Sequence, residues 1–597
     1  MSEPSKSWLA DVFQRRYREV TPLAIVFGIL IGIVMNASIT YSGLKIGFTL
    51  GGSAIAAVLG WGVLRGIFRR GTIVENNIAQ TAASSVNISN SGVIFTVPVL
   101  FLLGLENDVS WGWISAACVA GAILGVAFII PTRKQMIDFE RLRFPTGTAV
   151  AAVLRSPGEG VRKSVVLLTG IFIAMAVVFF TKSDAALGFP GFGALGEALG
   201  GGWLHAEDMN LGLILQNLGW RADMEFIWAL APFAIGAGYI TGGPGLVVLA
   251  GGILAYHVIT PVANAADWIP AAVSDEAAGG WARANMNRPL GIGMLMGGAM
   301  MGLVFAMPAI GAALSSMRRA EAGAGEREEL PLKVLYFAVV GAFVLLFFAA
   351  RSSVEGGGIG QALLIAGVGT GWMWFAGIVI AQCTGMTDWS PISGMALLTV
   401  MICLLLTGNQ VIPAVMIGAA VCVAITLCAD MMQDLKTGHM VGGLPMRQQF
   451  VEFLVVWIGP LVCIATVWLI AKANMSEFGV AFGGVSDAPA PQADALRGAI
   501  DSIRGGDSPT HLYAMGGIMG ALLSLSGIAG LGVLVGLSMY LPLAYLLPYG
   551  LGCLIQLFVK KTKGTAWAEN WGVPLAAGLI VGEGIVGVGF AAYEVLG

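Results

Sequence analysis

The chain has 597 residues, of which 57% are hydrophobic and 11% are charged, and its formal net charge is −3. Soluble proteins carry about 25% charged residues, so this composition excludes an ordinary soluble domain and indicates a protein embedded in the lipid bilayer. Nothing in so small a net charge points to a nucleic acid partner.

Apolar runs close to the ~20 residues that span a bilayer recur along the whole chain. They predict an all-α polytopic membrane protein with about 15–16 transmembrane helices, some of them broken or re-entrant. The seven cysteines contain no CxxC pair and the four histidines show no ligand spacing. We therefore expect neither a disulfide framework nor a bound metal or other cofactor.

Lysine and arginine predict the orientation of the chain. Most of the 32 basic residues lie in the N-terminal arm and in five later clusters, and the intervening loops carry acids instead. By the positive-inside rule, this pattern predicts a cytoplasmic N-terminus. We predict four parts: a cytoplasmic arm (1–19), a first transmembrane half (20–316), a cytoplasmic linker (317–332) and a second transmembrane half (333–597).

The first candidate segment, residues 74–92, is too polar for a plain span. We expect a helix that unwinds near residues 90–92 and lines a cavity, since unwound backbone at membrane depth needs protein or water beside it. The alternative is that these side chains join neighbouring helices. Earlier in the chain, Lys45 lies near an outer helix end and is expected to extend to water unless it meets a substrate carboxylate. The candidate residues in this segment are Glu75, Asn76, Asn77, Gln80, Thr81 and Ser84.

Residues 143–154 predict a short helix with a proline just inside its start. Thr146 and Thr148 fall near capping positions, and Phe144 precedes the proline. The N-terminus of such a helix can hold a carboxylate. An amphipathic connector at the cytoplasmic surface is the alternative.

Residues 382–394 break an apolar stretch. Asp388, Ser390 and Ser393 are the candidates there, and Asp388 is a possible proton site because burial favours the protonated form of a carboxyl. A plain extracellular turn is the alternative, but the predicted topology puts this segment on the cytoplasmic side or within the membrane.

The most informative stretch is 430–439 (DMMQDLKTGH), which follows an apolar run directly. In a helix, Asp430, Gln433, Asp434 and Thr437 share one face, and Gly438 is where we expect the helix to end. Ionisable groups at such a depth are candidates for function. The alternative is an ordinary cytoplasmic helix end. Glu583 lies in another apolar run and needs a partner there.

With these segments in place, the chain resembles the oligopeptide transporter (OPT) family on its prokaryotic branch. The resemblance covers nearly the whole sequence, and its motifs occur in the family's order. They are 75–84 (ENNIAQTAAS), 92–98 (GVIFTVP), 144–149 (FPTGTA), 390–394 (SPISG), 430–439, 540–543 (YLPL) and 575–583 (LAAGLIVGE).

The resemblance implies two related halves, a possible homodimer, and proton-coupled import of short peptides or metal chelates across the bacterial inner membrane by alternating access. The expected partners are the bilayer and a small-molecule substrate. Asp430 or Asp434 is our first choice for the proton carrier, followed by Glu75 and Glu583. The residues expected to bind substrate are Asn76, Asn77, Gln80, Thr81, Ser84, Phe144, Thr146, Thr148, Asp388, Ser390, Ser393 and Gln433.

Two other classes of protein compete with this hypothesis. An ion channel lacks support because no filter motif is repeated in the sequence. An intramembrane enzyme would need a reactive cluster, and only Asp430, Asp434 and His439 come near one. We therefore predict that the chain is not an enzyme.

Overall fold

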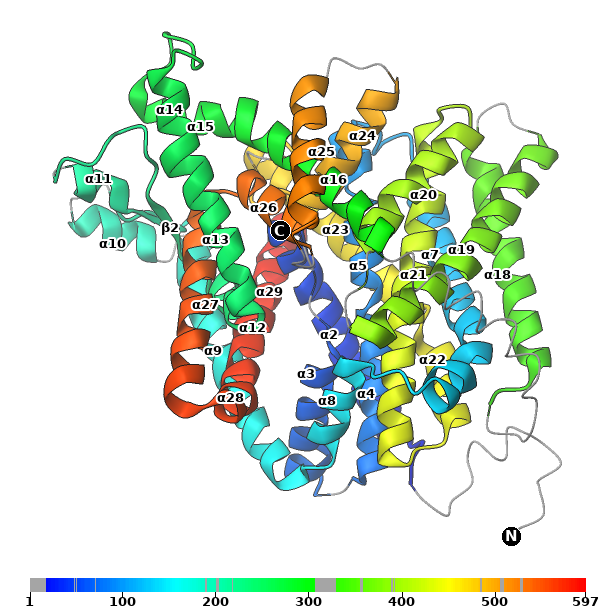
Figure 1. Ribbon diagram of the computed structural model, residues 1–597. Helices are drawn as coiled ribbons and strands as arrows, with labels where there is room; N and C mark the ends of the chain where they lie inside the picture. Colours follow the sequence, from blue (N-terminus) through cyan, green and yellow to red (C-terminus); the bar gives the residue numbers. More distant parts are fainter. Residues whose placement is uncertain are drawn as a thin grey trace, which may run out of the picture. The chain divides into compact units, whose positions relative to one another are not determined.

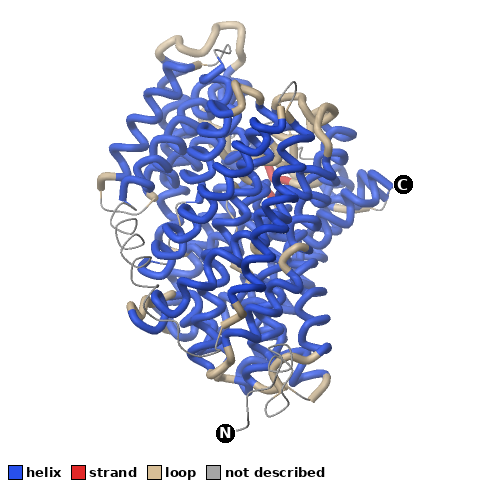
Figure 2. Tube along the Cα trace, turned by 90° about the vertical axis from the view of Figure 1, so that its right-hand side faces the viewer, coloured by secondary structure: helices blue, strands red, loops and turns tan. Residues whose placement is uncertain are grey.

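A computed structural model of the chain shows a molecule built almost entirely of helices (Figure 1). Figure 2 shows the same in a turned view, where the strand colour is confined to one short stretch. In the part of the chain described, the strands β1 (Asp208–Asn210) and β2 (Ile227–Ala229) form one antiparallel pair. The described residues are 18–47, 49, 51–69, 71–187, 190–199, 203–216, 218–305, 329–354, 358–387, 390, 392–483, 486–504, 509–526 and 530–596.

Eleven helices among the described residues are long and apolar enough to cross a membrane. Four shorter apolar helices accompany them, at Ser53–Ile67, Pro145–Leu154, Gly394–Leu406 and Leu531–Tyr540. The predicted all-α, multi-pass membrane protein is thereby confirmed.

The chain divides into two compact units, each made of three separate stretches. Unit 1 comprises Met1–Thr40, Phe48–Ser164 and Leu303–Trp468, and unit 2 comprises Tyr41–Gly47, Val165–Gly302 and Leu469–Gly597. This is a different division from the predicted halves, 20–316 and 333–597, which stay a prediction about duplication.

Four of the described helices include residues of both units: α2 (Pro22–Ile46), α9 (Pro157–Leu187), α16 (Arg288–Phe305) and α23 (Ile458–Phe478). The other α-helices of unit 1 are α3 (Ser53–Gly60), α4 (Ile73–Asn87), α5 (Ser89–Ile94), α6 (Val99–Leu102), α7 (Trp111–Ile129), α8 (Pro145–Leu154), α18 (Leu332–Ser353), α19 (Ile359–Thr387), α20 (Ile392–Leu406), α21 (Val411–Val441) and α22 (Pro445–Val455).

The other α-helices of unit 2 are α10 (Phe192–Leu199), α11 (Leu211–Gln216), α12 (Pro232–Thr241), α13 (Leu246–Ile253), α14 (Thr260–Ala265), α15 (Asp275–Ala282), α24 (Pro491–Arg504), α25 (Thr510–Ser524), α26 (Leu531–Tyr540), α27 (Leu543–Lys563), α28 (Thr565–Trp567) and α29 (Val573–Leu596). Short π or 3-10 turns connect several helices, at Trp61–Ile67, Ile130–Thr132, Lys134–Phe139, Gly243–Gly245, Leu254–Ile259, Arg283–Asn287 and Ala568–Gly572.

Helix α21 is the centre of unit 1, packed between α7 and α19 and touched by α4, α5, α8 and α20 (Figure 1). Gly121 and Gly125 of α7 lie directly against the backbone of α21 at Ala420 and Ala424, where a larger side chain would collide with carbonyl oxygens. Small residues of this kind let membrane helices approach closely. The close packing buries the polar end of α21 instead of leaving it in solvent.

Two predicted boundaries in unit 1 are wrong. Residues 90–92 are helical within α5, and the break lies at Ile88. The reason is that Gly92 is used for close packing against the α21 backbone at Val423, not for unwinding. Likewise α21 continues past Gly438 to Val441 and ends at Gly442 with φ 83°. Gly438 instead leaves room for the side chain of Gln448.

In unit 2, α12 packs against both α27 and α29, and α13 packs against α26. Gly238 and Gly552 lie at the α12–α27 contact, each against backbone atoms of the other helix. These packed helices surround the start of α12, where several charged side chains lie close together.

Candidate functional site

The first cluster of polar side chains lies in unit 1, where α21 faces α4. The hydroxyl of Ser84 donates a hydrogen bond of 2.6 Å to Asp430 Oδ2. One turn along both helices, Gln80 Nε2 donates a hydrogen bond of 2.6 Å to Asp434 Oδ1. All four side chains are buried. The two carboxyls therefore share one helix face, as the spacing predicts.

Helix α22 adds two residues that the sequence analysis missed. Gln448 Nε2 donates 2.9 Å hydrogen bonds to the hydroxyl of Thr81 and to the carbonyl oxygen of Asp434. One turn later lies Glu452, whose side chain is also buried. The sequence does contain a signal for them, because Gln448 and Glu452 are spaced i, i+4 and so share a helix face. They lie at the start of an apolar run that we interpreted as a plain transmembrane span.

This acid cluster, defined as Asp430, Asp434 and Glu452, has no basic partner among the ion pairs formed by the described residues. Several buried oxygens around it also lack a donor from the described part of the chain. Burying an anion without a cation is strongly unfavourable. Such surroundings favour the neutral form of a carboxyl. The four oxygens are Asp434 Oδ2, Gln80 Oε1, Gln448 Oε1 and Glu452 Oε1.

Gln433 and Thr437 lie on α21 near the acids but face α8. The backbone N–H of Gly147 donates a hydrogen bond of 2.7 Å to Gln433 Oε1. The Thr437 hydroxyl donates one of 2.9 Å to the carbonyl oxygen of Gly147. Gln433 thus occupies an N–H at the start of α8, the helix whose N-terminus we expected to hold a carboxylate.

The residues predicted around that helix start have different surroundings. Phe144 is fully buried with φ 44° and donates its backbone N–H to the carbonyl oxygen of Gly385. The Thr148 hydroxyl donates a hydrogen bond of 2.7 Å to the carbonyl oxygen of Arg143. Thr146 is half-buried in the first turn of α8. These contacts dock the short helix against its neighbours.

The structure separates the start of α4 from the acid cluster. Glu75 accepts a hydrogen bond of 2.6 Å from the Thr21 hydroxyl, at the start of α2. Asn76 Nδ2 donates one of 3.0 Å to the carbonyl oxygen of Ala57, and Asn77 is buried. Glu75 is therefore not brought to Asp430 and Asp434.

The predicted break at 382–394 is only partly described. Ser390 makes a hydroxyl–hydroxyl hydrogen bond of 2.5 Å with Thr384 of α19. Asp388 lies outside the described residues, and the side chain of Ser393 is not described.

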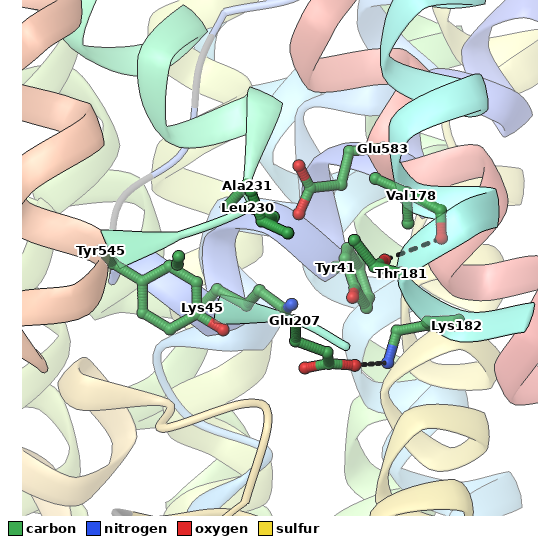
Figure 3. A pocket seen from close by; sticks show the side chains of 11 residues that line it. Tyr41, Lys45, Val178, Thr181, Lys182, Glu207, Leu230, Ala231, Tyr545 and Glu583 are labelled. Carbon is green, nitrogen blue, oxygen red and sulfur yellow. Dashed lines mark hydrogen bonds and ion pairs between the residues drawn. The ribbon is translucent and has the colours of Figure 1, made fainter. Parts of the chain in front are cut away.

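The second group of charged side chains surrounds a cavity of about 20 Å³ in unit 2, room for about one water molecule. Figure 3 shows Lys45 and Lys182 pointing toward this space, with Glu583 and Glu207 on different sides of it. Glu583 has the partner that its buried position requires, because Phe233 at the start of α12 donates its N–H to Glu583 Oε2 at 2.8 Å.

The expectation that the ammonium of Lys45 extends to water is wrong. Its side chain is 5% exposed, and its Nζ lies 2.8 Å from Asp487 Oδ1. The reason is that the segment between α23 and α24 brings Asp487 to the end of α2, so the ammonium finds a carboxylate without reaching water. Burial raises the pKa of the Asp487 carboxyl, but the ammonium groups of Lys45 and Lys182 lower it further, so that it lies well below its usual range.

Comparison with known proteins gives relatives along the full length of the chain. A "Putative oligopeptide transporter" of Haemophilus influenzae is 27% identical, with 92% of this chain and 91% of that protein covered. A "Probable metal-nicotianamine transporter YSL13" of Oryza sativa subsp. japonica is 24% identical over 98% of this chain and 85% of that protein. A "Probable metal-nicotianamine transporter YSL8" of Arabidopsis thaliana is 24% identical over 86% and 76%.

The family model described as OPT oligopeptide transporter protein matches residues 19–593, almost the entire chain. Members of this family are transporters and not enzymes. The many apolar helices agree with that class of protein. The chain therefore belongs to the oligopeptide transporter (OPT) family and is a multi-pass membrane transporter.

Proposed function

We propose that the protein imports short peptides across the bacterial inner membrane together with protons, by alternating access and with its N-terminus in the cytoplasm. The observation that carries the proposal is the acid cluster of unit 1, which is buried against α4 without a lysine or arginine partner among the described ion pairs. A proton carrier must gain and lose its charge during the cycle. Carboxyls whose partners are amides and hydroxyls can do so without leaving a cation unpaired.

The groups around the cluster suit a peptide substrate. Gln80 and Gln448 each have one amide oxygen without a donor from the described chain, although both side chains are buried. Free acceptors in a buried site favour a ligand that supplies N–H donors, since buried polar groups are normally paired. Peptide amides and a terminal ammonium supply them. We therefore place the substrate beside α4 and α22.

Import of a metal chelate is the second candidate. It is favoured by relatives named metal-nicotianamine transporters, which match this chain over most of its length. Such a substrate also carries donors and charge, so the same cluster serves both candidates.

A homodimer remains part of the proposal and would be tested by the mass of the purified protein in detergent.

The test is uptake into proteoliposomes that contain the purified protein. Labelled trialanine and a nickel–nicotianamine complex are offered separately, with and without an inward proton gradient. We expect trialanine to accumulate only with the gradient. Accumulation of the chelate alone would show that the protein transports metal chelates and not peptides. Equal uptake with and without the gradient would refute proton coupling.

Two variants connect the test to the acid cluster. Asp434→Asn and Glu452→Gln are expected to remove the response to the proton gradient. Asp108→Asn is the matched control, because Asp108 is an exposed acid of the same unit. Full uptake by Asp434→Asn under a gradient would remove that residue from the mechanism.

A further inference from the structure

The carboxylate of Asp487 in unit 2 is surrounded by four donors. Lys45 Nζ lies 2.8 Å and the Tyr545 hydroxyl 3.2 Å from Oδ1. On the other oxygen, the Tyr41 hydroxyl lies 3.2 Å and Lys182 Nζ 3.7 Å from Oδ2. Two ammonium groups and two phenols thus form a complete site for one carboxylate, which we call the carboxylate cage.

The cage and its occupant come from different kinds of structure. Lys45 and Tyr41 stand on α2, Lys182 on α9 and Tyr545 on α27, so the donors are fixed by helices. Asp487 lies between α23 and α24 in the chain and is not itself part of a helix. The donors are therefore positioned by the scaffold, independently of the segment that supplies the carboxylate.

The lysines of the cage also face open space. The small cavity is lined by Tyr41, Lys45, Lys182 and Tyr545, but Asp487 is not among its lining residues (Figure 3). Both ammonium groups are thus accessible from a side that Asp487 does not cover. The cavity has room for about one water molecule.

The charges around the cage favour an anion once Asp487 is taken away. Lys182 Nζ also pairs with Glu207 at 2.8 Å. Lys45, in contrast, has no carboxylate other than Asp487 within ion-pair distance among the described residues. Lys45 Nζ lies 4.7 Å from the centre of the Tyr41 ring and 5.5 Å from that of Tyr545. Aromatic faces hold an ammonium in place without neutralising it.

We propose that the cage formed by Tyr41, Lys45, Lys182 and Tyr545 is a binding site for a carboxylate group of the transported molecule, and that Asp487 occupies it as an internal competitor. The inference rests on the proposed function for the source of that carboxylate. A peptide C-terminus and a metal-chelating amino acid both supply the same group. Two ammoniums and two hydroxyls match its charge and its acceptor oxygens.

Two further arguments support the assignment. Asp487 has a pKa well below its usual range, because the two lysines outweigh the effect of burial, and this shows how strongly the cage prefers the anionic form of a carboxyl. In the proposed orientation, Lys45 lies near the outer end of α2, on the side from which an importer receives its substrate. The cage would then be an early contact for the incoming molecule.

The first experiment empties the cage and refills it with acetate. The full-length Asp487→Ala variant is purified in detergent, and its melting temperature is measured with sodium acetate and with sodium chloride at equal ionic strength. We expect acetate to raise the melting temperature by about 1–2 °C over chloride. The wild-type protein should show no such difference, because its own carboxylate fills the cage.

Matched variants separate the cage from general salt effects. Asp501→Ala removes a partly exposed aspartate of α24 that pairs with Arg497, and we expect it to respond like the wild type. Lys45→Met combined with Asp487→Ala should lose the acetate response. If acetate and chloride act equally on Asp487→Ala, the proposal is wrong. Should that variant fail to fold, Asp487→Ser, whose short side chain also leaves room for acetate, undergoes the same measurement with the same two outcomes.

The second experiment asks where the carboxylate comes from. Uptake of trialanine by the wild-type protein is compared with that of trialanine amide, which lacks the terminal carboxylate, and of nickel–nicotianamine. At least 10-fold slower uptake of the amide would assign the cage to a peptide C-terminus. Uptake of the chelate alone would assign it to chelate carboxylates. Equal uptake of peptide and amide would overturn the role in substrate binding, and absence of all uptake would refute the proposed function while the acetate result still stands.

Discussion

Each of the two units of this transporter buries carboxyl groups, and the partners of these carboxyls differ between the units. In unit 1, Asp430 and Asp434 have hydroxyl and amide partners, and the ion pairs of the described residues do not include them. In unit 2, Asp487 has two ammonium partners and two phenols. One cluster lacks positive charge and the other is built around it.

The difference determines what each cluster can do. A buried carboxyl without a cation can take up a proton and become neutral, with no other group left charged and unpaired. Protonating or removing Asp487 would instead leave two buried ammoniums with less negative charge, which is expensive in a low-dielectric interior. The unit 1 cluster therefore suits a proton that comes and goes. The unit 2 cage suits an anion, whether that anion belongs to the chain or to a ligand.

The largest expected effect is on coupling, from Asp434→Asn in unit 1. We expect proton-driven accumulation of substrate to fall to the level of empty liposomes. The free energy of unfolding should change by less than about 1 kcal/mol, because the amide keeps the shape and no cation loses its partner. Uptake in proteoliposomes measures the loss of proton-driven accumulation, and the melting temperature of the same preparation measures the change in stability. A variant that unfolds would contradict the comparison as clearly as one that accumulates substrate normally.

The corresponding substitution in unit 2, Asp487→Asn, should act on stability instead. Removing one partner of a buried ion pair costs about 3–5 kcal/mol, and Asp487 is the ion-pair partner of Lys45 and a second partner of Lys182 beside Glu207. The melting temperature in detergent without added carboxylate measures this loss. The Asp501→Asn control should cost less than about 1 kcal/mol, since that side chain is 31% exposed. If Asp487→Asn and Asp501→Asn lower the stability by the same amount, the carboxylate cage makes no special contribution to stability.

The effect of Asp487 should also depend on pH in one direction. The lysines lower the pKa of this carboxyl more than burial raises it, so the folded pKa lies below that of the unfolded chain. Such a group stabilises the fold above the unfolded pKa, about 3.9, and the stabilisation is lost as the pH falls through the folded value. We expect the difference between the wild type and Asp487→Asn to be constant from about pH 8 to about pH 5 and to shrink below about pH 4.

A scan of melting temperature against pH for both proteins provides this test. A difference that already shrinks between about pH 8 and about pH 5 would show that another titrating group controls the cage.

The sequence predicts much of the first cluster and little of the second. Asp430 and Asp434 are recognisable because four polar positions share one face of a helix that is otherwise apolar. Their partners are less visible, because Gln80 and Ser84 lie about 350 residues earlier in the chain. Glu452 was missed since a single acid at the start of an apolar run looks like an ordinary helix end.

The cage in unit 2 depends on contacts that no local pattern encodes. Asp487 lies more than 400 residues from Lys45 and Tyr41, in a segment without helical periodicity. A lysine near a helix end is normally expected to extend toward water, and only the tertiary fold shows that an aspartate meets it first. Both wrong helix boundaries, at 90–92 and at Gly438, have one cause, because glycine also serves close packing.

The smallest expected effect comes from the Tyr545 hydroxyl, one of the four donors to Asp487. Tyr545→Phe removes this hydrogen bond but keeps the ring 5.5 Å from Lys45 Nζ, so we expect a loss of about 0.5–1.5 kcal/mol. Tyr545→Leu also removes the ring, and the difference between the two variants measures its interaction with the ammonium. If Tyr545→Phe costs as much as Asp487→Asn, the four donors act as one cooperative unit. A substrate carboxylate would then have to satisfy all four at once in order to displace Asp487.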